Sequence, residues 1–280
     1  YNLKMGQEVI DDYYRAIEIY GGYQKPYVLA AKVFIIFEQY KEASGVIERA
    51  KAAKIESNDL AFQELRIKRS LAKDYEERKK VAKEIKNLYI EVQEEHGDIE
   101  DISLILHELA LCYYNMRENE LALKAIGDKL SLNKTDGSLE LKGNILYDME
   151  KYEEVIDIYK EFIQRYPSYN YAYYITGLCY ERLDKEDEAL DNYLKVIKVD
   201  SEYEYVYYRL MIIYKNRYRR SYRKEYYQMA VEYGKRQVQI KPDCYYYNEL
   251  GRLYMDGYDL DKALEAFNEA LKYEEVYVYN

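Results

Sequence analysis

Apolar and small residues recur along this chain at helical spacing. In the segment 170–203, Tyr173 and Gly177 lie four residues apart, and Ala189 and Tyr193 repeat that spacing. Residues three or four apart share one face of a helix, so the segment predicts two amphipathic helices joined by a short polar turn. The small residues let two helix backbones approach closely, while the large ones fill the space around this contact.

The same pattern recurs with a period near 34 residues, since Gly143 lies 177 − 143 = 34 positions before Gly177. Gly251 and Ala263 carry it near the end of the chain, 12 residues apart like Gly177 and Ala189. A helix pair of this kind cannot bury both faces alone and must stack on its neighbours. The predicted pairs span 24–57, 58–97, 103–135, 136–169, 170–203, 204–243 and 244–277.

Three parts of the chain depart from the regular pattern. Pair 58–97 is divergent, and pair 204–243 carries an insertion near 215–225. Residues 1–23 match only the second helix of a truncated repeat. We therefore predict that residues 1–280 form one solenoid of stacked helix pairs.

The order of large and small residues in 136–169, 170–203 and 244–277 resembles the tetratricopeptide repeat family. The resemblance covers nearly the whole chain and implies an all-α fold, a right-handed superhelical solenoid of stacked antiparallel helix pairs. Because the chain begins with half a repeat and residues 275–279 resemble the start of another first helix, we expect a fragment of a longer tetratricopeptide-repeat protein.

Charge and composition narrow the possible partners. The chain has 42 basic and 52 acidic residues, a net charge of −10, which disfavours non-specific nucleic-acid binding. No apolar run approaches the roughly 18 residues of a membrane helix, so no membrane span is expected. Three cysteines, Cys112, Cys179 and Cys244, lack C-x-x-C spacing and predict neither a disulfide framework nor a metal site. A cytoplasmic location is therefore expected.

Tyrosine dominates the aromatic residues, with 39 Tyr against 5 Phe and no Trp. Part of this excess falls on positions 2, 5, 9 and 12 of the first helices, which line the concave groove of a solenoid. Tyrosine brings large area, a polar tip and low rotamer entropy to binding surfaces. We therefore predict a peptide-binding or protein-binding groove, the alternative being that tyrosine is merely the preferred aromatic residue. The predicted groove residues are Tyr147, Tyr171, Tyr174, Leu178, Tyr205, Tyr208, Arg209, Ile212, Tyr245, Asn248 and Arg252.

One basic cluster stands out from the acidic background, in the insertion near 215–225. Arginine interleaved with Tyr218 and Tyr222 can bind phosphates and stack on bases, but one short patch supplies few phosphate contacts. The cluster therefore favours either an acidic protein partner or charge balance with Glu and Asp on adjacent repeats, and nucleic acid is not expected. Its residues are Arg217, Arg219, Arg220, Arg223 and Lys224.

No catalytic chemistry is predicted within this chain. It contains no G-x-S-x-G, H-E-x-x-H or Walker motif, and His96 and His107 are interpreted as solvated or structural histidines. The acidic run from Asp184 to Glu188 lacks the EF-hand ligand spacing and suits the start of a helix. We therefore expect no enzyme activity, no metal and no cofactor.

The family resemblance also suggests a test for chaperone binding. Some members grip the carboxylate end of a chaperone with lysine, asparagine and arginine side chains of their first helices. Asn144 and Arg209 occupy such positions, but Glu140, Ile175 and Tyr205 stand where Lys, Asn and Lys would be needed. The clamp is incomplete, so binding of chaperone tails is disfavoured.

The leading functional prediction is a non-catalytic protein-interaction scaffold that binds an unidentified peptide or protein segment in its tyrosine-rich groove. The alternative is a sensory, regulatory or scaffold region of a larger protein. In that case a catalytic, J-type co-chaperone or DNA-binding domain would lie outside these residues.

Overall fold

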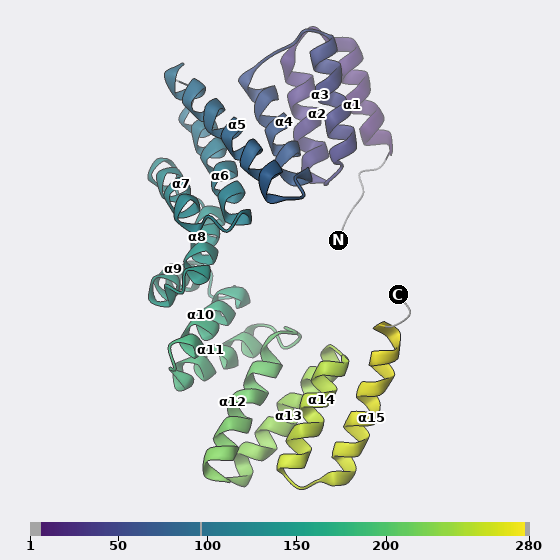
Figure 1. Cartoon of the computed structure of the whole chain (residues 1–280), viewed down its shortest axis with the longest axis vertical. Helices are drawn as coiled ribbons and strands as arrows, with labels where there is room; N and C mark the ends of the chain where they lie inside the picture. Colours follow the sequence, from purple (N-terminus) through teal and green to yellow (C-terminus); the bar gives the residue numbers. More distant parts are fainter. Residues whose placement is uncertain (1–6, 96, 278–280) are drawn as a thin grey trace. The chain divides into compact units, whose positions relative to one another are not determined.

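A computed structural model of the chain describes residues 7–95 and 97–277, without the side chains of Gln7 and 274–277. The described residues form fifteen α-helices and no strand (Figure 1), so the all-α prediction is confirmed. His96 lies outside the described residues, as do the first residues of the predicted half-repeat and the last ones of 275–279.

The chain divides into two compact units, the N-terminal unit of residues 1–149 and the C-terminal unit of residues 150–280. The N-terminal unit contains α1 (Gln7–Tyr20), α2 (Gln24–Ile36), α3 (Tyr40–Ala52), α4 (Asn58–Leu71), α5 (Tyr75–Glu94), α6 (Ile99–Asn115), α7 (Asn119–Leu132) and α8 (Asp136–Asp148). The C-terminal unit contains α9 (Tyr152–Arg165), α10 (Asn170–Arg182), α11 (Glu186–Val199), α12 (Val206–Ser221), α13 (Lys224–Ile240), α14 (Cys244–Asp256) and α15 (Leu260–Tyr277).

Consecutive helices pack as antiparallel pairs, and several of the turns inside the pairs share one backbone geometry. Asp184, between α10 and α11, has a left-handed φ of 57°, and the amide of Lys185 donates to the carbonyl of Tyr180 at 2.9 Å. Glu38, Arg117 and Tyr258 have the same left-handed φ in their turns. This is how a helix ends when one residue turns left-handed and the next amide bonds back to the last turn. Residues other than glycine fill all these positions.

Side chains cap the first amides of α4 and α5. Ser57 accepts the amide of Leu60 at 3.2 Å, and Asp74 accepts the amide of Glu77 at 2.8 Å. Such N-caps satisfy amides that have no partner inside the helix. The divergent segment 58–97 therefore still forms two well-bounded helices, α4 and α5.

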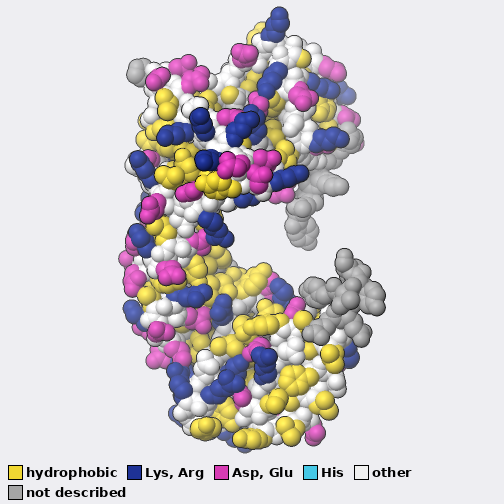
Figure 2. Space-filling model, in the orientation of Figure 1, with side chains coloured by type: hydrophobic (Ala, Val, Ile, Leu, Met, Phe, Trp, Pro, Cys, Tyr) yellow, Lys and Arg dark blue, Asp and Glu magenta, His cyan; other side chains and the backbone are white. Residues whose placement is uncertain are grey.

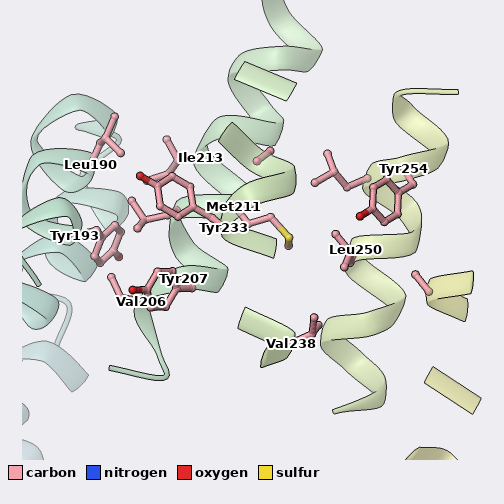
Figure 3. Packing of buried hydrophobic residues seen from close by; sticks show 14 of the residues in the cluster. Leu190, Tyr193, Val206, Tyr207, Met211, Ile213, Tyr233, Val238, Leu250 and Tyr254 are labelled. Atoms are coloured by element: carbon pink, nitrogen blue, oxygen red, sulfur yellow. The ribbon is translucent and has the colours of Figure 1, made fainter. Parts of the chain in front are cut away.

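The core of the C-terminal unit runs between the helix pairs (Figure 3). It joins α11, α12, α13 and α14 through large side chains, several of them tyrosines. Among those shown in the figure are Leu190, Tyr193, Val206, Tyr207, Met211, Ile213, Tyr233, Val238, Leu250 and Tyr254. The N-terminal unit holds two further clusters, one around Phe34 and one around Ile85 and Ile126.

Glycine sits where two helices approach most closely. A Cβ placed on Gly177 of α10 would lie 2.5 Å from Cε1 of Tyr193, and one on Gly251 of α14 would lie 2.6 Å from Cε1 of Phe267. Real Cβ atoms do not approach aromatic carbons so closely, so a larger residue must displace the ring. The packing role that the spacing assigns to Gly177 and Gly251 therefore has a direct steric cause.

We expect Gly177→Ala to lower the free energy of unfolding by about 1–3 kcal/mol, the usual cost of overpacking a core. Gly127 of α7 is a matched control, because a Cβ there meets nothing within 4 Å. Gly127→Ala should instead stabilise the protein by about 0.5–1 kcal/mol through helix propensity. Chemical denaturation followed by circular dichroism measures both. Equal effects of the same sign would contradict this explanation.

Candidate functional site

Six tyrosines gather at the starts of α10, α12 and α14 in the C-terminal unit, and we call them the tyrosine face. Tyr174 lies on α10, Tyr203 and Tyr205 precede α12, Tyr208 lies on α12, and Tyr245 and Tyr246 lie on α14. Figure 2 shows hydrophobic side chains, tyrosines included, gathered on the surface of this unit.

The first three rings form one contact group. The centroid of Tyr174 lies 5.4 Å from that of Tyr203 and 6.3 Å from that of Tyr205, and Tyr203 meets Tyr205 edge-on at 5.7 Å. Edge-to-face and tilted contacts at these distances are favourable for aromatic rings. Tyr174 also packs on the fully buried Tyr193 at 6.0 Å, which anchors the group to the core.

The other three rings form a second group. Tyr208 lies 5.5 Å from Tyr245 and 5.5 Å from Tyr246, and its hydroxyl is 2.6 Å from that of Tyr245. Burial, followed by this hydrogen bond, raises the pKa of Tyr208 well above its usual value. The phenol therefore stays protonated near neutral pH and keeps its capacity to donate a hydrogen bond.

Lys241 lies beside both groups. Its Nζ is 5.3 Å from the ring centroid of Tyr205 and 3.3 Å from a carboxylate oxygen of Glu204, and its charge also acts on Tyr246. A cation above an aromatic face is attracted by the ring. The tyrosine face thus combines aromatic area with the ion pair of Lys241 and Glu204.

The most exposed rings of the face are Tyr205 and Tyr245, at 48% and 52% of full exposure. The other four are half-buried and held by their neighbours. Rings fixed in this way lose little rotamer freedom when a ligand covers them.

Two glutamates connect the first helices next to this face. Glu181 of α10 accepts the hydroxyl of Tyr193 and lies 3.6 Å from the guanidinium of Arg209 on α12. Glu249 of α14 pairs with Lys215 of α12 at 2.8 Å. Both pairs bridge neighbouring repeats, so they fix the register of the helices that carry the tyrosines.

The Lys215–Glu249 pair is buried, with side-chain exposures of 8% and 10%. Burial alone would raise the pKa of Glu249, but Lys215 and Arg252 together hold it below its ordinary value. Arg252 reaches Glu249 at 2.8 Å, and its own side chain remains 67% exposed. The carboxylate of Glu249 is therefore buried between α12 and α14, whereas the side chain of Arg252 faces solvent.

The structure brings together part of the predicted groove. Tyr174, Tyr205, Tyr208 and Tyr245 lie on the tyrosine face, with Arg209 bonded to the adjacent Glu181. The remaining predicted residues lie elsewhere or beside it. Tyr171 packs on Tyr159 and Tyr169, Leu178 and Ile212 pack on the core, Asn248 is half-buried, and Tyr147 belongs to the N-terminal unit.

Sequence reasoning missed Tyr203, Tyr246 and Lys241 as members of this surface. Tyr203 lies in the turn before α12, and Lys241 follows the end of α13, so neither occupies one of the groove positions of a first helix. Their only signal is sequence proximity to Tyr205 and Tyr245, which are flanked by further aromatic residues.

The basic cluster is bound largely by carboxylates. Arg217 contacts Glu186 at 2.8 Å and also Asp187, and Arg220 contacts Glu186 at 2.6 Å. Arg219 pairs with Asp256 at 2.7 Å, and Arg223 lies 3.5 Å from Glu225. The extra residues of this segment lengthen α12 and α13, and Tyr218 packs on Tyr227 at 5.2 Å and on Tyr222 at 6.1 Å.

The same contacts account for the acidic run from Asp184 to Glu188, whose Glu186 and Asp187 bind arginine. Among the described residues, no group of three or more His, Cys, Asp or Glu is arranged to hold a metal ion. Burial raises the pKa of the Cys112 and Cys179 thiols to about 12, so both stay protonated near neutral pH. Over the described ranges, no helix combines the length and apolar character that crossing a bilayer requires.

A separate cavity of about 460 Å³ lies on another surface of the C-terminal unit, lined by α9, α10 and α11. Its lining mixes Tyr173 and Tyr180 with Asp191 and Lys195. It shares no residue with the tyrosine face and is the alternative location for a ligand in this unit.

Comparison with known proteins agrees with this architecture. Residues 141–203 match the family model described as the tetratricopeptide repeat, which confirms the resemblance found in the sequence. The C-terminal part of a tetratricopeptide repeat-containing protein from Cytophaga hutchinsonii superposes with a TM-score of 0.67 at 15% identity, covering 89% of this chain and 95% of that one. A crystal structure of MamA gives 0.53 at 22% identity, covering 60% and 95%. These likenesses show a shared fold, and no curated protein sequence matches significantly.

Proposed function

We propose that this tetratricopeptide-repeat chain is a non-catalytic interaction scaffold that binds a peptide or protein segment on the tyrosine face. The observation that carries the proposal is the gathering of six tyrosines, in two contact groups with Lys241 near both, at the starts of three successive first helices. Helices that stack in register present such a surface without any loop rearrangement.

The physical properties of the face favour a peptide. Exposed rings supply apolar area, protonated phenols donate and accept hydrogen bonds, and Lys241 and Arg252, each paired with a glutamate, supply further N–H donors. A segment with a large apolar side chain and backbone carbonyls satisfies both kinds of group. Because the rings already pack on one another, binding costs little ordering.

A random-peptide display library selected on the purified chain supplies the probe. The affinity of a selected, fluorescently labelled peptide is then measured by anisotropy. We expect Tyr205→Ser combined with Tyr245→Ser to weaken binding about 100-fold or more, since aromatic residues dominate binding hot spots. Both rings are largely exposed, so helical content should not change.

Two other tyrosines provide a matched control. Tyr222 and Tyr258 are 80% and 88% exposed and lie in the turns of the same unit, away from the tyrosine face. Serine at both positions should leave the affinity unchanged. If the control pair weakens binding as much as the test pair, or if neither does, the tyrosine face is not the binding surface.

A further inference from the structure

Two arginines in the N-terminal unit converge on one carboxylate. Arg66 and Arg69 extend from α4 to Glu108 of α6, with Nε–O distances of 3.1 and 2.5 Å to its two oxygens. The side chains are only 24%, 20% and 8% exposed. The cluster therefore keeps one excess positive charge in a partly buried place, where charge interactions are screened less than in water.

Most donors of these two arginines remain unused within the described parts of the chain. A guanidinium has five N–H groups. Arg66 donates to Glu108 and to Oε1 of Gln63, and Arg69 donates to Glu108 alone. Both side chains keep partial exposure, 24% for Arg66 and 20% for Arg69, which leaves a ligand access to them.

Neighbouring polar groups also lack partners among the described residues. Gln63 is fully buried, and its Nε2 has no acceptor although its Oε1 binds Arg66. Nδ1 of His107, next to Glu108, is likewise buried without a partner. Buried polar atoms are normally hydrogen-bonded, and these two unsatisfied atoms belong to residues that bond to Arg66 or feel the charges of Arg66 and Arg69.

Another cation of the same helix shows the contrast. Lys68 of α4 is bound by two carboxylates, Glu64 at 3.2 Å and Glu84 at 2.9 Å. Glu64 in turn also binds Lys51 at 2.8 Å, so two bases and two acids balance there, whereas at Arg66 and Arg69 two bases share one acid. The excess charge is thus specific to the surface of α4 that faces Glu108.

We propose that Arg66 and Arg69 form an oxyanion-binding site, which takes a carboxylate or phosphate group carried by a ligand. Arginine forks match the geometry of such groups and bind them in bidentate fashion. In this arrangement Glu108 orients the two guanidinium groups through their Nε atoms and leaves their outer N–H groups for the ligand. The site belongs to the N-terminal unit and does not depend on the tyrosine face.

Titration calorimetry at low ionic strength tests the site with two probes, inorganic phosphate and an acetylated triglutamate peptide. Arg66→Gln or Arg69→Gln should weaken binding of the preferred probe about tenfold or more, the loss expected for a charge-assisted hydrogen bond. Arg117→Gln is the control, because Arg117 pairs with Asp148 on the surface and is 78% exposed. Preference for one probe identifies the ligand class, and binding of both supports the shared oxyanion chemistry.

Glu108→Gln distinguishes a ligand site from a purely structural triad. Since the negative charge of Glu108 opposes an anion bound to the outer N–H groups of the same arginines, its neutralisation should strengthen oxyanion binding several-fold even though it lowers stability. A triad that only joins α4 to α6 would bind neither probe in the wild-type protein. Absence of saturable binding at millimolar concentration would overturn the proposal. Equal weakening of binding by Arg66→Gln, Arg69→Gln and Glu108→Gln would also overturn it.

The wild-type protein provides a readout that needs no folded variant. Burial lowers the pKa of His107, and Lys129, Arg69 and Arg66 lower it further against the opposing effect of Glu108. An oxyanion bound at the arginines adds negative charge nearby and should raise this pKa, as followed by NMR of the imidazole with and without phosphate or the peptide. An unchanged pKa at saturating probe would place the anion elsewhere.

Discussion

Replacing Lys215 with methionine is expected to lower the free energy of unfolding of the C-terminal unit by about 3–5 kcal/mol. The change removes one partner of a buried ion pair and leaves Glu249 charged at the buried contact between α12 and α14. Arg252 remains within reach, but its largely exposed side chain cannot replace the buried ammonium. Urea denaturation followed by circular dichroism measures the loss.

Two comparisons isolate the buried pair. Lys195 pairs with Asp191 at 2.6 Å on the surface, where both side chains are about half-exposed or more, so Lys195→Met should cost under about 1 kcal/mol. Adding Glu249→Leu to Lys215→Met should recover much of the loss, because no unpaired buried charge remains. If Lys215→Met costs no more than Lys195→Met, the pair does not hold these helices.

The effect of Lys215→Met should also depend on pH. The pKa of Glu249 is lowered in the folded protein, so the stability that this carboxylate contributes is present above its unfolded pKa, about 4.3. This contribution is lost as the pH falls through the folded value. The difference between wild type and variant should therefore narrow on acidification below about pH 4. A difference that is constant with pH would mean that packing of the lysine stem, rather than its charge, is responsible.

Tyr193→Ala is the second change with a large expected effect, a loss of about 3–5 kcal/mol. Tyr193 is fully buried, lies against Gly177, and contacts Tyr174 of the tyrosine face. Its removal leaves a cavity of ring size at the contact between α10 and α11. Tyr193→Phe keeps the ring and loses only the hydrogen bond to Glu181, so it should cost about 1 kcal/mol.

A double-mutant cycle tests the steric argument for Gly177. In wild type, a Cβ at this position meets the ring of Tyr193, whereas in Tyr193→Ala that ring is absent. Gly177→Ala should therefore change sign in the Tyr193→Ala background and become neutral or stabilising. Simple additivity of the two changes would show that the glycine and the ring do not interact.

The helix pairs and their tight contacts are predictable from sequence because they depend on spacing within one repeat. Gly177 and Tyr193 lie 16 residues apart, and helical periodicity alone brings them onto facing surfaces.

Contacts between repeats are harder to predict, since they depend on how far one pair rotates on the next. Lys215 stands at the start of the insertion near 215–225 in the sequence, yet it is buried against Glu249, 34 residues away. Arg217 and Arg220 instead reach back to Glu186 of the preceding pair. Arg66 and Arg69 lie on a divergent repeat, and their meeting with Glu108 depends on the stacking of α4 on α6.

The tyrosine face could be predicted from the sequence only in part. Helical spacing selected Tyr174, Tyr205, Tyr208 and Tyr245, whose rings form two contact groups with Lys241 near both. The same rule included Tyr171, which packs instead on Tyr159 and Tyr169. Helical spacing tells which side of the helix a residue faces, whereas the neighbouring repeat decides which side chains on that side remain exposed.

The most direct test of the binding proposal is a crystal structure of the chain with a library-selected peptide. We predict that the peptide lies across the tyrosine face, in contact with Tyr205, Tyr208 and Tyr245. A peptide seated in the cavity lined by α9, α10 and α11, or on the N-terminal unit, would contradict the proposal.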